Sequence, residues 1–206
     1  MPELPEVETI VRGLRRAVVG KTLRNFLVFD KKIDRPKLFT PQKITNVVRH
    51  GKYIVCETSR GRCLVHLRMT GELLLGRQTA KHRHERARFV FSGRRHLNFI
   101  DRRRFGTMEW LKKKDALPPL GPDPLSSGFT AENFHGILQN SSRGIKSLLL
   151  DQKAVAGIGN IYADESLWMA KINPQRKSDK IGLREAKKLR DVIRAVFREA
   201  IKYGGF

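Results

Sequence analysis

Cysteine, acidic side chains and long apolar runs are all scarce in this 206-residue chain, and each scarcity excludes a class of protein. Two thiols cannot form a Cys₄ zinc site, and no Cys-x-x-Cys pair is present. No apolar run approaches the roughly 20 residues of a membrane-spanning helix. The first residues are acidic, whereas a signal peptide begins with a basic and then an apolar segment. The sequence therefore predicts neither a membrane protein nor an exported one.

The two cysteines, Cys56 and Cys63, flank the turn Ser59-Arg60-Gly61. This spacing predicts that they face one another across a β-hairpin. A chain without an export signal is expected to keep its thiols reduced. We therefore expect two buried, unpaired cysteines.

Basic residues are abundant where acidic ones are few: 42 Lys and Arg stand against 20 Asp and Glu, a net charge of +22. Such an excess indicates a polyanionic partner, either nucleic acid or an acidic membrane surface. The basic residues are spread through segments with recognisable secondary structure, so the charge is expected to cover a folded surface. Together with the missing membrane and export signals, this predicts a cytoplasmic, nucleoid-associated protein.

The first half of the chain combines one helix with short β-rich runs. Apolar residues at helical spacing predict a helix over residues 5–18, followed by Gly20 as a stop signal. Many short strands separated by turn signals are typical of an antiparallel sandwich or barrel. The predicted strands are Leu23–Phe29, Ile44–Arg49, Tyr53–Glu57, Leu64–Leu67, Glu72–Leu75, Arg88–Phe91, Leu97–Ile100 and Thr107–Leu111.

The second half is predicted to be helical, over residues 130–140, 145–151, 159–171 and 183–203. Residues 112–128 hold four of the nine prolines and no periodic pattern, which marks a boundary between domains. We predict an α+β protein with an N-terminal domain over residues 1–115, a linker over 116–128 and a helical domain over 129–206.

The N-terminus carries a candidate nucleophile. If Met1 is removed, Pro2 becomes a secondary amine next to Glu3 and one helical turn from Glu6. An α-amino group has an ordinary pKa of about 7.7–8.0, so roughly a tenth of such amines are nucleophilic at neutral pH. A secondary amine that attacks an aldehyde-level carbon forms an iminium, a strong electron sink. The alternative is that Pro2 only starts a helix whose positive end the glutamates complement, and this segment alone favours that alternative.

Two further motifs fit a polyanion. Gly157-Ile158-Gly159-Asn160 precedes a predicted helix, where exposed amides would bind phosphate and Asn160 would cap the helix or contact the same phosphate. Close helix packing also requires glycine, but the net charge favours a contact with the DNA backbone. The run Asp101–Gly106 sets three arginines beside Phe105, which suits phosphate contact and insertion into a base stack. Its alternative is a basic turn whose Phe105 packs in the core.

Other candidates are less distinctive. Met69 follows a predicted strand, and a methionine there is more often part of the core. His66, His82 and His84 are not accompanied by carboxylates at zinc-ligand spacing, so we predict phosphate or backbone contacts for them and no metal or cofactor.

In combination, these segments resemble the formamidopyrimidine-DNA glycosylase family of base-excision repair enzymes. The resemblance covers essentially the whole chain in the family's order. Its segments are MPELPEVET (1–9), HGKY (50–53), HLRMTG (66–71), KHRH (81–84), RRFG (103–106), LGPDPLS (120–126) and LLDQKAVAGIGNIYADE (149–165).

The resemblance implies a β-sandwich domain joined to a helical domain with a helix–two-turn–helix motif, acting as a monomer on double-stranded DNA. It also implies the roles of single residues. Pro2 is the nucleophile, Glu3 the acid/base, and Lys52 a catalytic partner that holds phosphate or lesion. Glu6 and Lys146 position the lesion or its sugar. The DNA-binding residues are Met69, Arg103 and Phe105, which fill the gap left by the flipped nucleotide, with His84, Arg104, Gly159 and Asn160.

The resemblance has two departures. Arg102 stands where the family usually has proline, and the chain ends at Phe206 where family members continue through a lesion-capping loop and a zinc-finger hairpin. We therefore predict a glycosylase and AP lyase that removes oxidised purines (8-oxoguanine and formamidopyrimidines) from DNA by β,δ-elimination, without zinc. The alternatives are an AP lyase without lesion recognition and a non-catalytic module that binds damaged DNA.

Overall fold

The computed structural model describes residues 1–34, 36, 39–77, 80–93 and 95–205. The chain divides into two compact units, and helix α1 (Leu4–Val18) contributes to both. The β unit contains residues 1–2 and 10–116, and the helical unit contains residues 3–9 and 117–206. The domain bounds expected from the sequence, with a linker over 116–128, stay a prediction.

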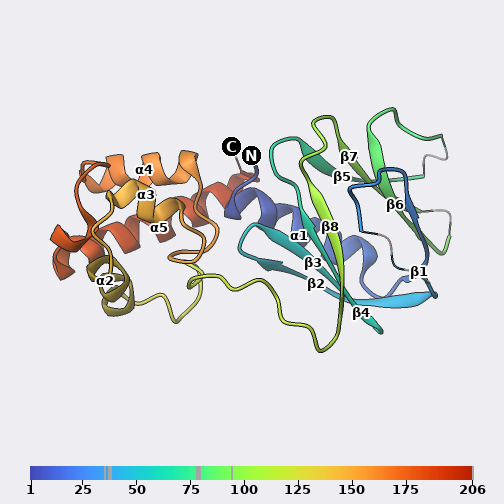
Figure 1. Cartoon of the computed structure of the whole chain (residues 1–206), viewed down its shortest axis with the longest axis horizontal. Helices are drawn as coiled ribbons and strands as arrows, with labels where there is room; N and C mark the ends of the chain where they lie inside the picture. Colours follow the sequence, from blue (N-terminus) through green and yellow to red (C-terminus); the bar gives the residue numbers. More distant parts are fainter. Residues whose placement is uncertain (35, 37–38, 78–79, 94, 206) are drawn as a thin grey trace. The chain divides into compact units, whose positions relative to one another are not determined.

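In its described residues, the β unit is built from eight antiparallel strands, labelled in Figure 1. The strands are β1 (Thr22–Val28), β2 (Gln42–His50), β3 (Tyr53–Thr58), β4 (Gly61–His66), β5 (Gly71–Gly76), β6 (Glu85–Phe91), β7 (His96–Asp101) and β8 (Thr107–Lys112). Their order is β5-β7-β6-β1-β2-β3-β4-β8. Strands β1 and β2 meet only through Thr22–Lys43 and Leu23–Gln42 among the described residues, so the sheet separates into two halves. This confirms the predicted antiparallel sandwich.

The two cysteines lie at the centre of the hairpin β3–β4. Cys56 is directly opposite Cys63 in the strand register, and both thiols are free and buried. Burial raises the pKa of Cys56 to about 12 and the pKa of Cys63 well above its ordinary value. The prediction of two reduced thiols facing each other is confirmed.

The helical unit surrounds a core of its own. Its helices are α2 (Ala131–Gln139), α3 (Ile145–Leu150), α4 (Asn160–Ala170) and α5 (Leu183–Tyr203), with a 3₁₀ turn η1 (Ser178–Lys180). Helix α5 buries an apolar face, with Leu189, Ile193 and Phe197 fully inaccessible. They pack in one cluster with residues of α2, α3 and α4 and with Leu4 at the start of α1.

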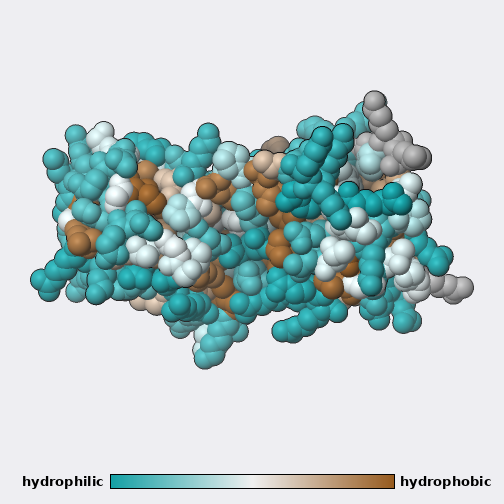
Figure 2. All heavy atoms as spheres, turned by 90° about the horizontal axis from the view of Figure 1, so that it is seen from below, coloured by the Kyte–Doolittle hydropathy of each residue, from teal (hydrophilic) through white to brown (hydrophobic). Residues whose placement is uncertain are grey.

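The surface is largely hydrophilic, as expected for a chain with many charged residues. Hydrophilic residues cover most of the face drawn in Figure 2, with small hydrophobic patches between them. In the described part of the chain, no helix is both long and apolar enough to cross a membrane.

Candidate active site and DNA interface

The carboxylate of Glu3 is held at the start of helix α4. It accepts hydrogen bonds from the backbone N–H groups of Gly159 at 2.6 Å, Ile161 at 3.0 Å and Tyr162 at 3.4 Å. Glu3 is only 3% exposed. Several N–H donors and the positive end of a helix stabilise a buried negative charge. The structure therefore fixes the position of a carboxylate immediately after Pro2 in the chain, and its role as acid/base stays a prediction.

Two glycines make room for this arrangement. Gly157 has a φ of +88°, and a Cβ there would lie 2.6 Å from a methyl carbon of Leu4. At Gly159 a Cβ would lie 2.3 Å from the carboxyl carbon of Glu3. Leu4 also donates its N–H to the carbonyl of Gly157 at 3.0 Å. The glycine-rich turn is thus shaped to receive the N-terminal segment.

This contact changes the interpretation of the start of α4. The expectation that Asn160 caps the helix is wrong, because Gly159 holds the cap position and makes no side-chain cap bond. The amides expected to bind phosphate donate to Glu3 instead, including the amide of Gly159. The side chain of Asn160 is exposed, so its contact with a phosphate stays a prediction, as does a role of Gly159 in DNA binding.

Glu6 and Lys146 also lie in the helical unit. Glu6 accepts the hydroxyl of Tyr162 on one oxygen and the N–H of Glu3, at 2.7 Å, on the other. Lys146 pairs with Asp164 at 2.8 Å, and both side chains are partly exposed. Glu6 is therefore oriented by the same helix that holds Glu3, whereas Lys146 forms a partly exposed ion pair, and its role toward DNA stays a prediction.

The predicted nucleophile belongs to the β unit. Pro2 is half-buried and Met1 is 44% exposed. While Met1 is attached, the nitrogen of Pro2 is part of an amide and cannot act as a nucleophile. Its activity as an amine depends on removal of Met1.

Two loops of the β unit present exposed hydrophobic side chains. Met69, between β4 and β5, is 47% exposed, and Phe105, between β7 and β8, is 50% exposed. The alternatives that place either side chain in the core are wrong. The guanidinium of Arg103 lies 4.8 Å from the ring centre of Phe105. A basic group stacked on an exposed ring fits insertion beside a phosphate backbone.

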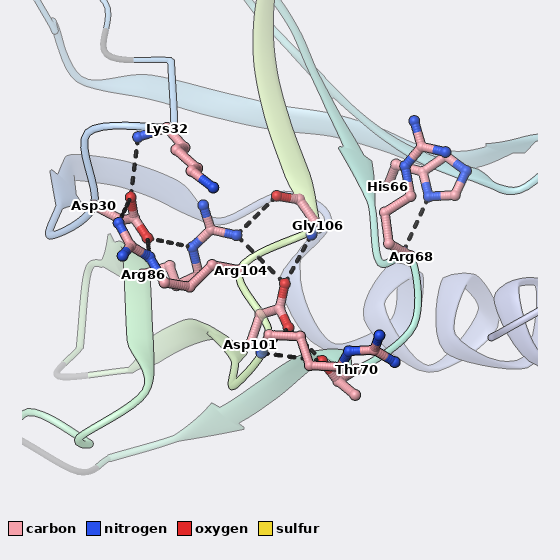
Figure 3. A network of polar contacts seen from close by, with 10 residues as sticks. Asp30, Lys32, His66, Arg68, Thr70, Arg86, Asp101, Arg104 and Gly106 are labelled. Carbon is pink, nitrogen blue, oxygen red and sulfur yellow. Dashed lines mark hydrogen bonds and ion pairs between the residues drawn. The ribbon is translucent and has the colours of Figure 1, made fainter.

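A buried polar network lies beneath these loops (Figure 3). Asp101 accepts the hydroxyl of Thr70 at 2.5 Å and the N–H groups of Arg103 at 3.1 Å and Gly106 at 2.7 Å. Arg86 donates to Asp101 at 3.3 Å and to the carbonyl of Gly106 at 2.9 Å. These contacts join both loops to strands β6 and β7.

The network also engages Arg104, which the sequence predicted to hold a phosphate. Its Nε and Nη2 donate to Asp30 at 2.7 and 2.9 Å, while Arg86 donates to the same carboxylate at 2.8 Å. These bonds hold the pKa of Asp30 far below its usual range, the bond from Arg104 being the largest cause. The side chain of Arg104 is 56% exposed, so a phosphate contact is still open to its Nη1.

Neutral histidines and a buried lysine complete the β unit's candidates. Burial, with the nearby charges of Arg68 and Lys52, lowers the pKa of His66 to about 4, and its Nδ1 accepts the N–H of Arg68 at 3.1 Å. Lys52 is 6% exposed. His84 accepts the Nε–H of Arg83 at 2.8 Å, and its pKa is lowered by burial and neighbouring basic groups.

Within the described residues, no group of three or more His, Cys, Asp and Glu side chains is placed to hold a metal ion. Because both cysteines are buried opposite each other in a hairpin, the residues described do not fit a cysteine zinc site.

Family models identify the chain. Residues 1–108 match the formamidopyrimidine-DNA glycosylase N-terminal domain, and residues 120–206 match the formamidopyrimidine-DNA glycosylase H2TH domain. The chain belongs to the formamidopyrimidine-DNA glycosylase family. The formamidopyrimidine-DNA glycosylase of Xanthomonas axonopodis pv. citri (strain 306) is 38% identical over 216 residues, covering all of this chain and 80% of that protein. The enzyme of Escherichia coli O6:H1 is 37% identical over 214 residues, with the same coverage.

Solved structures of formamidopyrimidine-DNA glycosylases have the same fold. The Lactococcus lactis protein, bound non-covalently to DNA with an AP site, has a TM-score of 0.91 at 34% identity and covers 98% of this chain and 83% of its own. The Thermus thermophilus protein has a TM-score of 0.90 at 39% identity, over 99% and 77%. These matches confirm the predicted α+β fold with a helix–two-turn–helix domain.

Sequence reasoning missed four residues around the site: Asp30, Arg86, Asp101 as an acceptor, and Tyr162. Asp30 and Arg86 are 56 positions apart, and no local pattern links them. The only local signal was the charge of Glu85, Arg86 and Arg88 beside the apolar residues of one strand, and a buried charge requires a partner.

Proposed function

We propose that this chain is a base-excision repair DNA glycosylase and AP lyase. It removes oxidised purines, 8-oxoguanine and formamidopyrimidines, and nicks the strand by β,δ-elimination. Family membership over both domains supports this function. Formamidopyrimidine-DNA glycosylases with the same fold have been solved on DNA containing an AP site and on DNA containing carbocyclic 8-oxo-G.

The proposed nucleophile is the amine of Pro2 after removal of Met1. Its nitrogen attacks C1′ of the damaged nucleotide, the bond from C1′ to the base breaks, and an iminium joins Pro2 to the opened sugar. The iminium withdraws electrons from C1′ and so acidifies the hydrogens on C2′. Loss of one of them eliminates the 3′ phosphate, and a second elimination releases the 5′ phosphate. One nucleophile thereby serves both excision and strand cleavage.

The observation that carries this proposal is the buried carboxylate of Glu3. It directly follows Pro2 and is fixed by the amides of Gly159, Ile161 and Tyr162, so it is oriented before substrate binds. We assign it the role of acid/base, assisting sugar-ring opening and proton transfer. Because three donors hold this carboxylate in place, any proton that it accepts or returns is transferred at one fixed position.

The remaining proposed roles concern DNA. Lys52 acts as a catalytic partner near the lesion, and Glu6 and Lys146 position the lesion and its sugar. Exposed Met69 and Phe105 fill the gap left by the flipped nucleotide and offset part of the few kcal/mol that unstacking costs. His84, Arg103, Arg104, Gly159 and Asn160 contact the DNA. The protein acts as a monomer, and we place it in the cytoplasm at the nucleoid.

Borohydride trapping tests the proposal. The protein is incubated with a duplex containing 8-oxoguanine and with an abasic duplex, and borohydride then reduces any iminium to a stable crosslink. Intact mass establishes beforehand that Met1 is absent. We expect a crosslink to both duplexes, with peptide mapping locating it at Pro2.

Other outcomes select the alternatives. A crosslink to the abasic duplex alone indicates an AP lyase without lesion recognition. Binding of both duplexes without any crosslink indicates a non-catalytic module and contradicts the proposal.

Variants test the proposed roles. Pro2→Gly replaces the secondary amine by a primary amine, so its excision activity should be weakened but not abolished. Glu3→Gln should lower excision of 8-oxoguanine by at least about a hundredfold, the usual contribution of an acid/base group. Glu8→Gln, in helix α1 that begins directly after Glu3, is the matched control and should retain activity. If Glu3→Gln and Glu8→Gln lost excision activity equally, the result would contradict the acid/base role of Glu3.

A further inference from the structure

The two exposed hydrophobic side chains follow residues with an unfavourable backbone. Arg68 has a φ of +54° and precedes Met69, and Arg104 has a φ of +59° and precedes Phe105. Residues with a Cβ rarely adopt this left-handed conformation, which persists only when surrounding contacts enforce it. Such backbones cluster at functional sites. The two loops are therefore held in shape by something outside themselves.

The buried network supplies those contacts. Asp101 binds Thr70 of the first loop and the N–H groups of Arg103 and Gly106 at the two sides of the second (Figure 3). Arg86 in turn binds Asp101 and the carbonyl of Gly106. One pair of charged residues thus fixes both loops at once.

Arg86 also reaches the other side of the second loop. Its Nε binds Asp30, and Asp30 binds Arg104, the residue with the left-handed backbone. Arg86 is 2% exposed and is the single described residue that contacts Asp30, Asp101 and Gly106 together.

We propose that Arg86 is a positioning residue for DNA distortion: it fixes Met69 and Phe105 in the geometry that fills the gap in the duplex. This inference rests on the proposed function and adds to it a residue that touches neither DNA nor the reacting atoms. Arg86 is expected to affect the enzyme only where a stacked nucleotide must be extruded.

Stability alone does not explain this arrangement. Replacing a buried ion pair by apolar residues is often neutral or stabilising, so such a pair is weak support for a purely structural role.

A double-mutant cycle tests whether Arg86 acts through Phe105. Excision of 8-oxoguanine from duplex DNA is measured as kcat/KM for wild type, Arg86→Met, Phe105→Ala and the double variant. We expect each single variant to lose about tenfold and the double variant to lose no more than about twofold beyond Phe105→Ala, because coupled residues are not additive. Losses that multiply would overturn the proposal.

Two readouts separate positioning from folding. Fluorescence of 2-aminopurine beside the lesion reports unstacking, and its rise should be slowed in Arg86→Met. Borohydride trapping on a single-stranded abasic site needs no extrusion and should change less than about twofold. Equal losses on duplex and single strand would contradict the proposal. Absence of trapping in the wild type would instead refute the proposed function itself.

Two further variants guard against a folding defect. Thr70→Val removes the hydroxyl that donates to Asp101 and accepts the N–H of Arg103 at 3.4 Å, and it leaves every charge in place, so it should slow the fluorescence rise in the same direction. Thr58→Val is the matched control: in the same unit, it removes the buried hydrogen bonds of the Thr58 hydroxyl with Gln42 of β2 and with Gly61 of β4. It should lower stability without changing excision. A Thr70→Val variant identical to wild type in the fluorescence rise would overturn the proposal even if Arg86→Met does not fold.

Discussion

At the scale of single residues, the carboxylate of Glu3 packs so closely against the backbone of Gly159 that no space is left for a Cβ at residue 159. This close packing also has an electrostatic effect, because the backbone amides of Gly159 and Ile161 donate hydrogen bonds to the carboxylate of Glu3 and stabilise its charge. Glycine is therefore required at residue 159 by its neighbour and not by its own backbone, which is extended.

Gly159→Ala should destabilise the helical unit. The added Cβ would lie 2.3 Å from the carboxyl carbon of Glu3, and overpacking of this kind costs about 1–3 kcal/mol. Urea unfolding measures the loss, and Glu3→Ala in the same background should recover part of it. The control Gly136→Ala, at an exposed helical position with no atom within 4 Å, should be stabilising by roughly 0.5–1 kcal/mol. Equal effects of the two substitutions would contradict the fit.

His66 should make stability depend on pH. Its folded pKa of about 4 lies below the ordinary value of 6.5, so the unfolded chain binds the extra proton first. The contribution is complete above pH 6.5 and is lost as the pH falls toward about 4, by about 3 kcal/mol.

The variant His66→Asn tests this dependence. An asparagine oxygen can still accept the N–H of Arg68 but does not titrate in this range. The free energy of unfolding, measured at about pH 4.5 and pH 7, should change less in the variant than in the wild type. An unchanged difference would assign the pH dependence to other groups.

At the scale of elements, helix α2 begins with a side-chain cap, which α3 and α4 lack. Thr130 accepts the N–H of Asn133 at 3.2 Å and so satisfies an amide at the start of α2. Thr130→Ala should lower the stability by about 1 kcal/mol. Thr130→Ser, which keeps the acceptor, is the control, and urea unfolding of both variants measures the difference. Trapping on an abasic duplex should be unchanged, because α2 carries no proposed site residue.

Most elements were predictable because their residues follow simple periodicity. The helix expected over 183–203 has those bounds in the structure, and all eight strands occur where expected. Strand β6 begins at Glu85 and not at Arg88, because Glu85 and Arg86 are charged and buried at once. Apolar patterning cannot detect a charged residue whose partner is remote in the sequence. The 3₁₀ turn Ser178–Lys180 was missed for lack of any periodic signal.

The candidate site was predictable where motifs are local and was missed where contacts are remote. The turn Gly157–Asn160 was recognised, but its contact with Glu3 crosses more than 150 residues of chain. The same holds for the network of Asp30, Arg86 and Asp101, whose members lie on different strands or loops. A sequence shows which charges exist but not which of them meet.

At the scale of the whole molecule, the net charge of +22 should govern affinity for DNA. Each neutralised phosphate releases counterions, so the logarithm of the binding constant falls with the logarithm of salt by about 0.9 per contact. Six contacts would cost roughly a thousandfold between about 50 and 200 mM salt. Fluorescence anisotropy with a labelled duplex measures the slope.

The slope also tests whether Lys146, which we propose to position the lesion and its sugar, does so through a phosphate. In that case Lys146→Gln should reduce the slope by about one unit, whereas Lys43→Gln, at an exposed position of β2, should leave it unchanged. A flat salt response of the wild type would argue against nucleic acid as the partner.

The two free thiols that face each other in the hairpin β3–β4 have a consequence for chemistry outside the active site. With a pKa of about 12, Cys56 is ionised at neutral pH to only about one part in a hundred thousand, and oxidants and alkylating reagents attack the thiolate. A protein acting on oxidised DNA would thus keep its own sulfur atoms unreactive while folded. A thiol reagent would then label Cys56 and Cys63 only in molecules whose sandwich has unfolded. The rate of labelling would therefore report the rate of unfolding.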